Sequence, residues 1–462
     1  MTVTLDPPVR RTRPFGLVIA AVGIPAFMGA LDNLVVSTAL PVIRTELGAS
    51  ISDLQWFVNA YTLPFAAFLL TAAALGDRIG RRRMYLGGIA VFTIASAAAA
   101  LATAPWQLTA ARAVQGLGGA AIAPLSLTLL AAAVPDRLRN AAVGIWGGIT
   151  GLGVAVGPVI GGAVVDGLTW NWIFWVNVPI GVGALILAAV VLDESRGGAR
   201  RLDPLGLLLS ASGMLLLIWG IVDGPDRGWT TGRVPVMLAA GATLTVAFLY
   251  WQSRNSTPML PLRLFRSRSF ALVNLVALTF SAGAFGSVFL LAQSFQVVQG
   301  LSPLESGLRT LPWTAAPMVV APLAGIFGAR VGARNLIVAG QICLAAGILW
   351  IALASSVDAG YARFVGGFVL GGVGMGLTFA PISTVTLASV VEDQRGVASG
   401  TNNTVRAFGV AAGVAVLSSI FSSYGGFASA QSFVDGLVPA ILAGAAVLAV
   451  GAVVATRLPA RQ

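Results

Sequence analysis

Residues 65–103 read FAAFLLTAAALGDRIGRRRMYLGGIAVFTIASAAAALAT. Two apolar runs flank one short segment, residues 76–83, which carries every charged side chain of this stretch. An apolar run of about 20 residues is long enough to cross a lipid bilayer as a helix. Because the bilayer core offers no water to backbone groups, a spanning chain satisfies them inside helices. The stretch therefore predicts two membrane-spanning helices joined by a basic loop.

The rest of the chain repeats this pattern. Hydrophobic residues make up 57% of the 462 and charged residues 10%, with a mean hydropathy of +0.88, whereas a soluble domain has about 25% charged residues. We expect an all-α integral membrane protein with about 14 transmembrane helices. The expected spans are residues 15–40, 54–76, 84–103, 107–134, 141–165, 171–192, 204–222, 234–251, 270–298, 306–328, 334–354, 361–390, 399–421 and 434–456. The weakly polar stretch 422–433 leaves this count open by two, because it is able to pair as a hairpin.

The composition excludes several classes of function. The chain contains no Lys, no His and a single Cys, Cys343. A P-loop needs Lys, a Ser-His-Asp triad needs His, and zinc sites are built from His and Cys. We therefore expect no enzyme, no cofactor and no bound metal, and an ion gradient as the source of energy. The net charge of +11 does not indicate nucleic acid as a partner, because the arginines are spread over many loops and form no single stripe.

The arginines concentrate on alternate loops, which sets the expected orientation. Lys and Arg gather on the cytoplasmic side of membrane spans. If the N terminus is cytoplasmic, the outer loops contain three arginines, Arg44, Arg227 and Arg233. The inner loops then contain most of the remaining arginines. The sequence thus predicts a multi-pass protein of the cell membrane with both termini in the cytoplasm, and we expect it to act as a monomer.

The chain also repeats internally. Residues 76–81 (GDRIGR) follow the second expected span, and residues 328–334 (GARVGAR) follow the tenth, about 252 positions later. Arg112 and Gly116 correspond in the same way to Arg363 and Gly367. Two related helical halves with a site at their interface are typical of transporters. We expect two pseudo-symmetric six-helix bundles, residues 1–200 and 266–462, with a two-helix insert and linker at 201–265.

Five ordered motifs carry a family resemblance. They are residues 31–41 (LDNLVVSTALP), 76–83 (GDRIGRRR), 112–119 (RAVQGLGG), 153–162 (GVAVGPVIGG) and 170–179 (WNWIFWVNVP). Together they resemble the signatures of the major facilitator superfamily, and in particular of its fourteen-span drug:proton antiporters. Two positions depart from the family pattern: Ala73 stands where the loop signature usually begins with Gly, and Ala329 replaces the Asp of the second copy.

The resemblance implies roles for several of these residues. Gly76, Asp77, Arg78, Gly80 and Arg81 would form a cytoplasmic gate that latches the two halves together, whereas the alternative is a solvated ion pair plus topology charge worth under about 1 kcal/mol. The stripe Gly153, Gly157, Pro158 and Gly161 would seal one helix against another and suppress proton leak. Small residues permit such close packing, and Pro158 is expected to bend its helix. In the family the fourth-span arginine, here Arg112, is implicated in proton transfer.

Asp32 is the clearest charged residue inside an apolar run. A carboxylate in the bilayer core costs about 2.5 kcal/mol or more, so acids at such positions are usually functional. We expect Asp32 to carry the coupled proton, with Arg112 tuning its proton affinity; the alternative is a buried acid satisfied by its neighbours. Arg112 itself is open to three roles: counter-ion, hydrogen-bond fork or structural tie.

Aromatic and amide side chains in the spans suggest the substrate cavity. They suit bulky, amphipathic or cationic guests, although packing against lipid or other helices is the alternative for each. The expected residues are Asn33, Trp56, Asn59, Tyr61, Trp146, Phe289, Gln293, Gln296 and Trp313.

Four further charged residues lie in or near the expected spans. Ser302 to Glu305 forms the pattern of a capping box, which explains Glu305 better than a second coupling carboxylate does. Asp166 and Asp435 are expected near the outer ends of spans, and Arg406 either lies buried or extends to the cytoplasmic face.

The sequence predicts a membrane transporter. We expect a proton-coupled antiporter that exports hydrophobic, amphipathic or cationic small molecules by alternating access, with protons and a small-molecule substrate as its partners. A dedicated translocator of natural products, metabolites or lipids, and a membrane sensor without transport, stay open as alternatives.

Overall fold

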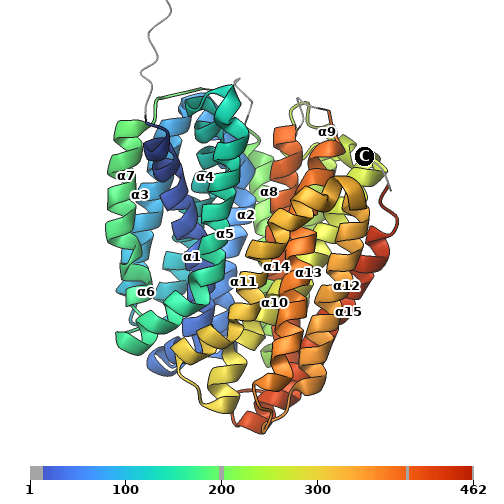
Figure 1. Ribbon diagram of the computed structural model, residues 1–462. Coiled ribbons are helices and arrows are strands. Elements are labelled where there is room, and N and C mark those ends of the chain that lie inside the picture. The colour runs from blue at the N-terminus through green and yellow to red at the C-terminus, as the bar shows by residue number, and fades with distance from the viewer. Residues whose placement is uncertain (1–13, 197–201, 231, 392–394, 460–462) are drawn as a thin grey trace, which may run out of the picture.

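The computed structural model describes residues 14–196, 202–230, 232–391 and 395–459, and every regular element in these ranges is a helix (Figure 1). The first part of the chain contains α1 (Phe15–Leu47), α2 (Ile51–Ile79), α3 (Arg81–Ala100), α4 (Pro105–Ala133), α5 (Asp136–Gly167), α6 (Trp172–Trp175) and α7 (Asn177–Val191). It is followed by α8 (Pro204–Arg227), α9 (Val234–Arg254) and the 3-10 helix η1 (Leu262–Arg266). The last part contains α10 (Arg268–Gln299), α11 (Pro303–Val331), α12 (Ala333–Ala354), α13 (Ala362–Ala388), α14 (Arg395–Tyr424) and α15 (Ala430–Ala455).

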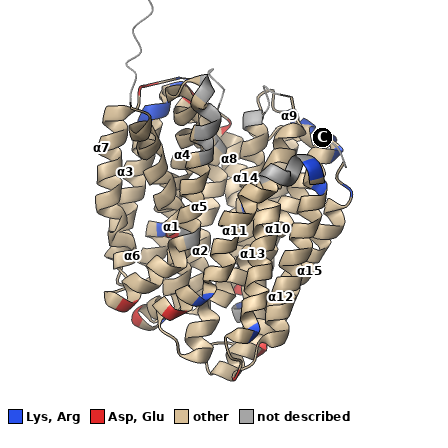
Figure 2. Ribbon diagram, in the orientation of Figure 1, with Lys and Arg blue, Asp and Glu red and all other residues tan. Residues whose placement is uncertain are grey.

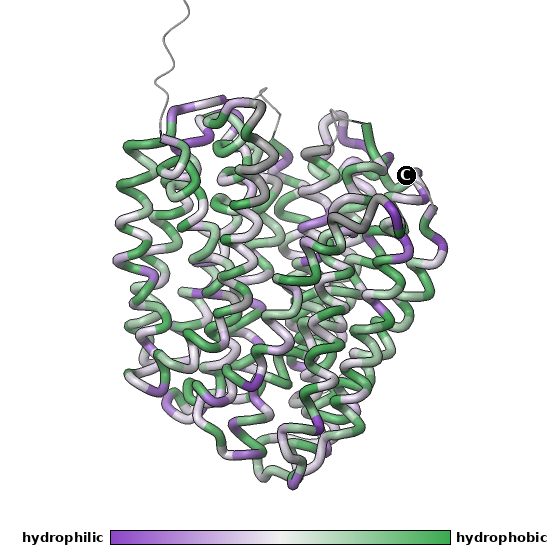
Figure 3. Tube along the Cα trace, viewed as in Figure 1, coloured by the Kyte–Doolittle hydropathy of each residue, from purple (hydrophilic) through white to green (hydrophobic). Residues whose placement is uncertain are grey.

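The helices are long enough to cross a membrane many times. In the described residues, eleven helices qualify by length and hydropathy, or up to thirteen if each of two bent helix pairs is a single span. Apolar residues dominate the middle of the helices and hydrophilic residues gather towards the ends (Figure 3). The expected number of fourteen stays a prediction. Residues 425–429 form a short connection between α14 and α15 and not a hairpin.

Two helices bend along their length, and the sequence accounts for the bend of α5. The segments 145–154 and 156–167 of α5 meet at 44°, and the segments 51–69 and 71–79 of α2 meet at 50°. Proline has no backbone N–H, so Pro158 leaves the carbonyl of Val154 without its helical partner. The bend of α5 lies directly after Val154, as the position of Pro158 predicts.

The internal repeat is visible in two matching turns. Gly80 joins α2 to α3 with φ of 124°, and Gly332 joins α11 to α12 with φ of 85°. Only glycine adopts such angles without strain, so each sharp junction between long helices depends on it. The two junctions are the repeated GDRIGR and GARVGAR segments, which explains why their glycines recur.

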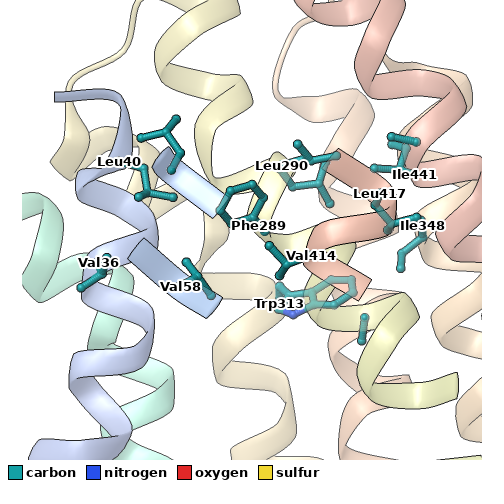
Figure 4. Packing of buried hydrophobic residues seen from close by; sticks show 14 of the residues in the cluster. Val36, Leu40, Val58, Phe289, Leu290, Trp313, Ile348, Val414, Leu417 and Ile441 are labelled. Atoms are coloured by element: carbon teal, nitrogen blue, oxygen red, sulfur yellow. The ribbon is translucent and has the colours of Figure 1, made fainter. Parts of the chain in front are cut away.

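Helices α1 to α7 lie on one side of the molecule and α10 to α15 on the other, with α8 between them in the view of Figure 1. The two sides meet where α5 packs on α11, α2 on α14 and α1 on α10. One apolar core continues across this boundary: Leu40 and Val58 lie near Phe289, and that core extends to Leu417 and Ile441 (Figure 4). Figure 2 shows charged residues mainly towards the two ends of the helices.

Candidate functional site

A buried polar cluster lies among α1, α3, α4 and α7, and we call Asp32, Ser96, Arg112, Gln115 and Asn177 the polar cluster. Each of the five side chains is at most 2% exposed. Arg112 and Gln115 are three residues apart on α4, so they share one face of that helix. Asn177 is the first residue of α7, directly after the break that separates α6 from α7. Four different helices therefore contribute to a site that is closed to solvent.

The Asp32 carboxylate accepts hydrogen bonds from three donors. Its Oδ2 pairs with Nη1 of Arg112, and its Oδ1 accepts from Nε2 of Gln115 at 2.9 Å and from Nδ2 of Asn177 at 3.1 Å. Hydrogen bonds to the ionised form of a carboxyl group favour that form. This arrangement is thus suited to a carboxylate, because a proton on Asp32 would face only donor groups.

Arg112 is held from several directions. Its Nε donates to the backbone oxygen of Phe57 at 3.0 Å, and its Nη1 also donates to Oε1 of Gln115 at 2.7 Å. The rings of Tyr61 and Phe174 lie 4.5 and 5.9 Å from the guanidinium carbon. Cation–π contacts stabilise a guanidinium that is removed from water. Arg112 therefore acts as counter-ion and as hydrogen-bond donor at once.

Asp32 and Arg112 were predicted from the sequence, but three of their partners were not. Gln115 and Asn177 stand inside the quoted motifs 112–119 and 170–179, and Ser96 accepts from Nε2 of Gln115 at 2.9 Å. Their signal is a polar residue inside an apolar span. For Gln115 the spacing of three from Arg112 adds a second signal.

A large cavity lies between the two sides of the molecule. It has a volume of about 1410 Å³ and is lined by α1, α2, α4 and α5 from one side and by α10, α13 and α14 from the other. It extends to exposed residues such as Ser256 and Arg263, at the end where α2 meets α3. Asp32 and Arg112 do not line it, but Tyr61 does.

The opposite end of the cavity is closed by contacts between the two sides. Nε2 of Gln296 on α10 donates to the backbone oxygen of Thr38 on α1 at 2.7 Å. The backbone N–H of Leu304 on α11 donates to Oδ2 of Asp166 on α5 at 3.3 Å. At the same end Ser302 and Glu305 make both bonds of a capping box, so that prediction is confirmed. In the part of the chain that the structure describes, the cavity therefore opens towards the end where α2 meets α3.

The residues expected around the substrate fall into two groups. Tyr61, Trp146 and Phe289 line the cavity. Five others do not line it: Trp56, Asn59, Gln293, Gln296 and Trp313. The two tryptophans pack edge-on against other rings, Trp56 on Trp219 and Trp313 on Phe368. Asn59 is fully buried, and the two glutamines donate to backbone oxygens. The side chain of Asn33 lies outside the described part of the structure. The role of all nine in substrate binding stays a prediction.

The loop between α2 and α3 is held by a residue that the sequence analysis did not identify. The backbone N–H groups of Arg82 and Arg83 donate to the carboxylate of Glu194 at 3.0 and 3.2 Å, where it caps the start of α3. Asp77 Oδ1 accepts from Nε of Arg81 at 2.7 Å, Gly80 lies against the Glu194 carboxylate, and Arg78 is exposed. Among the described residues these contacts stay on the α1–α7 side of the molecule, and Gly76 packs against Leu125 of α4.

The glycine stripe of α5 packs on α1. A Cβ added to Gly153, Gly157 or Gly161 would lie 2.8 Å from the Phe27 oxygen, 2.9 Å from Leu34 Cβ and 3.0 Å from the Val35 oxygen, respectively. The stripe thus supports the part of α1 that carries Asp32. The contact with α11 uses neighbouring residues instead: the backbone of Pro158 lies against Gly307, and Gly162 lies against Pro303.

Asp203, a carboxylate at the mouth of the cavity, already has hydrogen-bond partners in the protein. Asp203 precedes α8 and accepts from the Trp251 indole at 2.7 Å, the Gln252 amide at 2.6 Å and the backbone N–H of Gly206 at 2.9 Å. Burial raises the pKa of Asp203, but these hydrogen bonds lower it, and the net pKa lies below its usual value. The carboxylate is therefore ionised and satisfied by the protein itself.

Comparisons with known proteins agree with this architecture. The model of the Major Facilitator Superfamily matches residues 22–414. Multidrug resistance protein Stp of Mycobacterium tuberculosis is 38% identical over 410 residues, which are 88% of this chain and 76% of that protein. The tetracenomycin C resistance and export protein of Streptomyces glaucescens is 34% identical over 415 residues, 89% of this chain and 77% of that protein.

A solved structure shows the same fold. The crystal structure of a POT family transporter in complex with 5-aminolevulinic acid superposes with a TM-score of 0.70 at 13% identity, covering 96% of each chain. The family model spans most of the sequence, and the two relatives are 38% and 34% identical over about three quarters of their length. This multi-pass membrane protein therefore belongs to the major facilitator superfamily.

Proposed function

We propose that this protein is a proton-coupled antiporter of the cell membrane that exports amphipathic small molecules by alternating access. The observation that carries the proposal is the polar cluster, in which a buried carboxylate and guanidinium pair beside a large cavity. A charge pair that is buried at such a cost is retained where it has a task. We assign the coupled proton to Asp32.

The hydrogen bonds of the polar cluster support a proton cycle. Every partner of the Asp32 carboxylate is a donor, which fits the state that has released its proton. Binding a proton would require Arg112 to withdraw or the Gln115 amide to turn its oxygen towards Asp32. Withdrawal of Arg112 would break its contact with the Tyr61 ring, so protonation and the shape of the cavity wall are linked.

The cavity supports the alternating-access part of the proposal. It reaches the end of the molecule that holds the arginine-rich α2–α3 loop, and contacts between α5 and α11 close the other end. Positive loops face the cytoplasm, so this is the inward-open state with both termini in the cytoplasm. Residues 1–200 and 266–462 would rock about the cavity as two six-helix bundles, with α8 and α9 as the insert between them, which gives fourteen spans in all.

The relatives support export of small molecules and favour one alternative. One is a multidrug resistance protein, which fits a broad substrate range. Another is a resistance and export protein for tetracenomycin C, so dedicated export of a natural product is the second candidate.

Reconstitution tests the proposal. The full chain is placed in liposomes with an acidic lumen that contains a pH-sensitive dye, and candidate substrates are added outside. Antiport predicts that a transported substrate alkalinises the lumen and that an uncoupler abolishes its accumulation. Accumulation that persists with the uncoupler would contradict proton coupling, and a lumen that stays acidic with every substrate would contradict antiport.

A further inference from the structure

Arg406 is a cation in the cavity wall that forms no hydrogen bond or ion pair with the residues that the structure describes. It follows Arg395, the first residue of α14, by 11 positions, which places it about 16 Å along the helix at 1.5 Å per residue. Its side chain lines the cavity, and the Phe379 ring centroid lies 3.7 Å from the guanidinium carbon. Within the described ranges Arg406 makes no hydrogen bond or ion pair, and its Nε is buried without an acceptor.

The other charges of the cavity do not balance it. Asp77 pairs with Arg81, and Asp203 accepts hydrogen bonds from Trp251 and Gln252. The fifth charged lining residue, Arg263, is exposed at the mouth. The depth of the cavity thus carries one uncompensated positive charge.

Two further polar groups of the cavity wall are also able to donate. The Trp146 indole N–H and the Ser281 hydroxyl both line the cavity, are buried, and have no hydrogen-bond partner among the described residues. The walls between them are aromatic or aliphatic, with Phe65, Phe285 and Phe289 among the lining residues. The cavity therefore combines hydrogen-bond donors with a largely apolar wall.

We propose that the cavity selects amphipathic anions, meaning molecules with an aromatic or aliphatic body and a carboxylate or other deprotonated acid that pairs with Arg406. A guanidinium forms two parallel hydrogen bonds with a carboxylate, and its attraction is stronger away from bulk water. A cationic guest would instead meet a like charge. The inference rests on the proposed function only in taking this cavity as the transport site, and it replaces the expectation of cationic guests.

Two dyes with one body and opposite charges test the inference. Fluorescein is anionic and rhodamine 123 is cationic, and both contain a xanthene ring system. Binding of each to the purified full chain in a non-ionic detergent is measured by fluorescence anisotropy, and export of each is measured in liposomes. We expect wild-type protein to bind fluorescein at least about tenfold more tightly than rhodamine 123, the scale of one ionic contact.

Matched variants locate the effect. Arg406→Gln is expected to weaken fluorescein binding about tenfold and to leave rhodamine 123 unchanged or tighter, whereas Arg406→Lys keeps most of the preference. Arg309→Gln is the control, because Arg309 lies outside the cavity and donates to Gln299. Asn403→Asp is a second variant that leaves Arg406 in place: it puts a carboxylate three residues before Arg406 on the same helix face and should also weaken fluorescein binding.

Each outcome decides between the two proposals. Charge-dependent binding that is lost in Arg406→Gln, with no transport of either dye, supports this inference and contradicts export. Transport of rhodamine 123 alone leaves export standing and overturns the inference. Equal binding of fluorescein by wild type, Arg406→Gln and Asn403→Asp also overturns it.

Discussion

The ring of Tyr61 separates the Arg112 guanidinium from the cavity. The guanidinium carbon lies 4.5 Å from the ring centroid, and Tyr61 lines the cavity while Arg112 is 1% exposed. The backbone of Tyr61 also lies against Gly116, where an added Cβ would be 2.2 Å from its carbonyl oxygen. Tyr61 is thereby fixed as a wall between the water-accessible cavity and the polar cluster.

Removing this wall should let protons leak. Tyr61→Ala is expected to open a water path to Asp32, because the substitution removes the ring that covers Arg112 on the side of the cavity. Passive proton entry into substrate-free liposomes should rise several-fold over wild type. Tyr61→Phe is the control, since the described structure contains no hydrogen bond from the Tyr61 hydroxyl and the ring stays in place. Equal leak rates for the alanine and phenylalanine variants would contradict the wall.

Asp32→Asn should uncouple transport from protons. An amide has no proton to exchange, so substrate should no longer alkalinise an acidic lumen, whereas the protein still inserts and still binds substrate. The matched control is Asp435→Asn, because Asp435 pairs with Gln431 in an exposed position at the start of α15. Proton-coupled export by Asp32→Asn at the wild-type rate would refute the role of Asp32.

Arg112 and Asp32 should be strongly coupled in stability. Arg112→Gln leaves a buried carboxylate without its counter-ion, which typically costs about 3–5 kcal/mol. The double variant Asp32→Asn with Arg112→Gln removes both charges and should recover much of that loss. Thermal unfolding of purified Asp32→Asn, Arg112→Gln and the double variant in detergent measures the effect. If the loss of stability in the double variant equals the sum of the losses in the two single variants, the two charges do not stabilise each other.

The fold was predictable to the extent that apolar runs determine it. The seventh expected span, 204–222, corresponds to α8 (Pro204–Arg227), and only its end differs. The break at Val176 inside the sixth was not predicted, although Asn177 and Pro179 follow it directly and proline is tolerated in the first turn of a helix. Length and hydropathy are local properties, so they locate helices well and their interruptions poorly.

The site was predictable only where burial is costly. A lone carboxylate in an apolar run stands out, so Asp32 and its partner Arg112 could be identified. Trp313 and Gln293 were expected in the cavity but pack elsewhere, because a helix that is apolar on all sides gives no signal for which face points inward. Arg406 was visible as a charge, but its direction depends on how α13 and α14 pack, which the sequence does not determine.

The contact between α5 and α11 should control which end of the cavity is closed. A Cβ on Gly162 would lie 2.3 Å from the backbone oxygen of Pro303, and backbone cannot move aside as a flexible side chain does. Gly162→Ala should therefore separate the two helices and shift the protein away from the inward-open state. Gly151→Ala is the matched control, because a Cβ there meets nothing within 4 Å on the same helix.

Disulfide formation reports this shift directly. Cys343 is the sole cysteine, so Cys343→Ser gives a background without thiols. Asp166→Cys and Leu304→Cys then probe the closed end, where the Asp166 carboxylate accepts from the Leu304 N–H at 3.3 Å. We expect several-fold slower cross-linking with Gly162→Ala than with Gly151→Ala, and faster labelling of the free thiols. If the two variants cross-link at the same rate, the α5–α11 contact does not hold the closed end, and the conformational part of the proposed cycle has to rest on other helices.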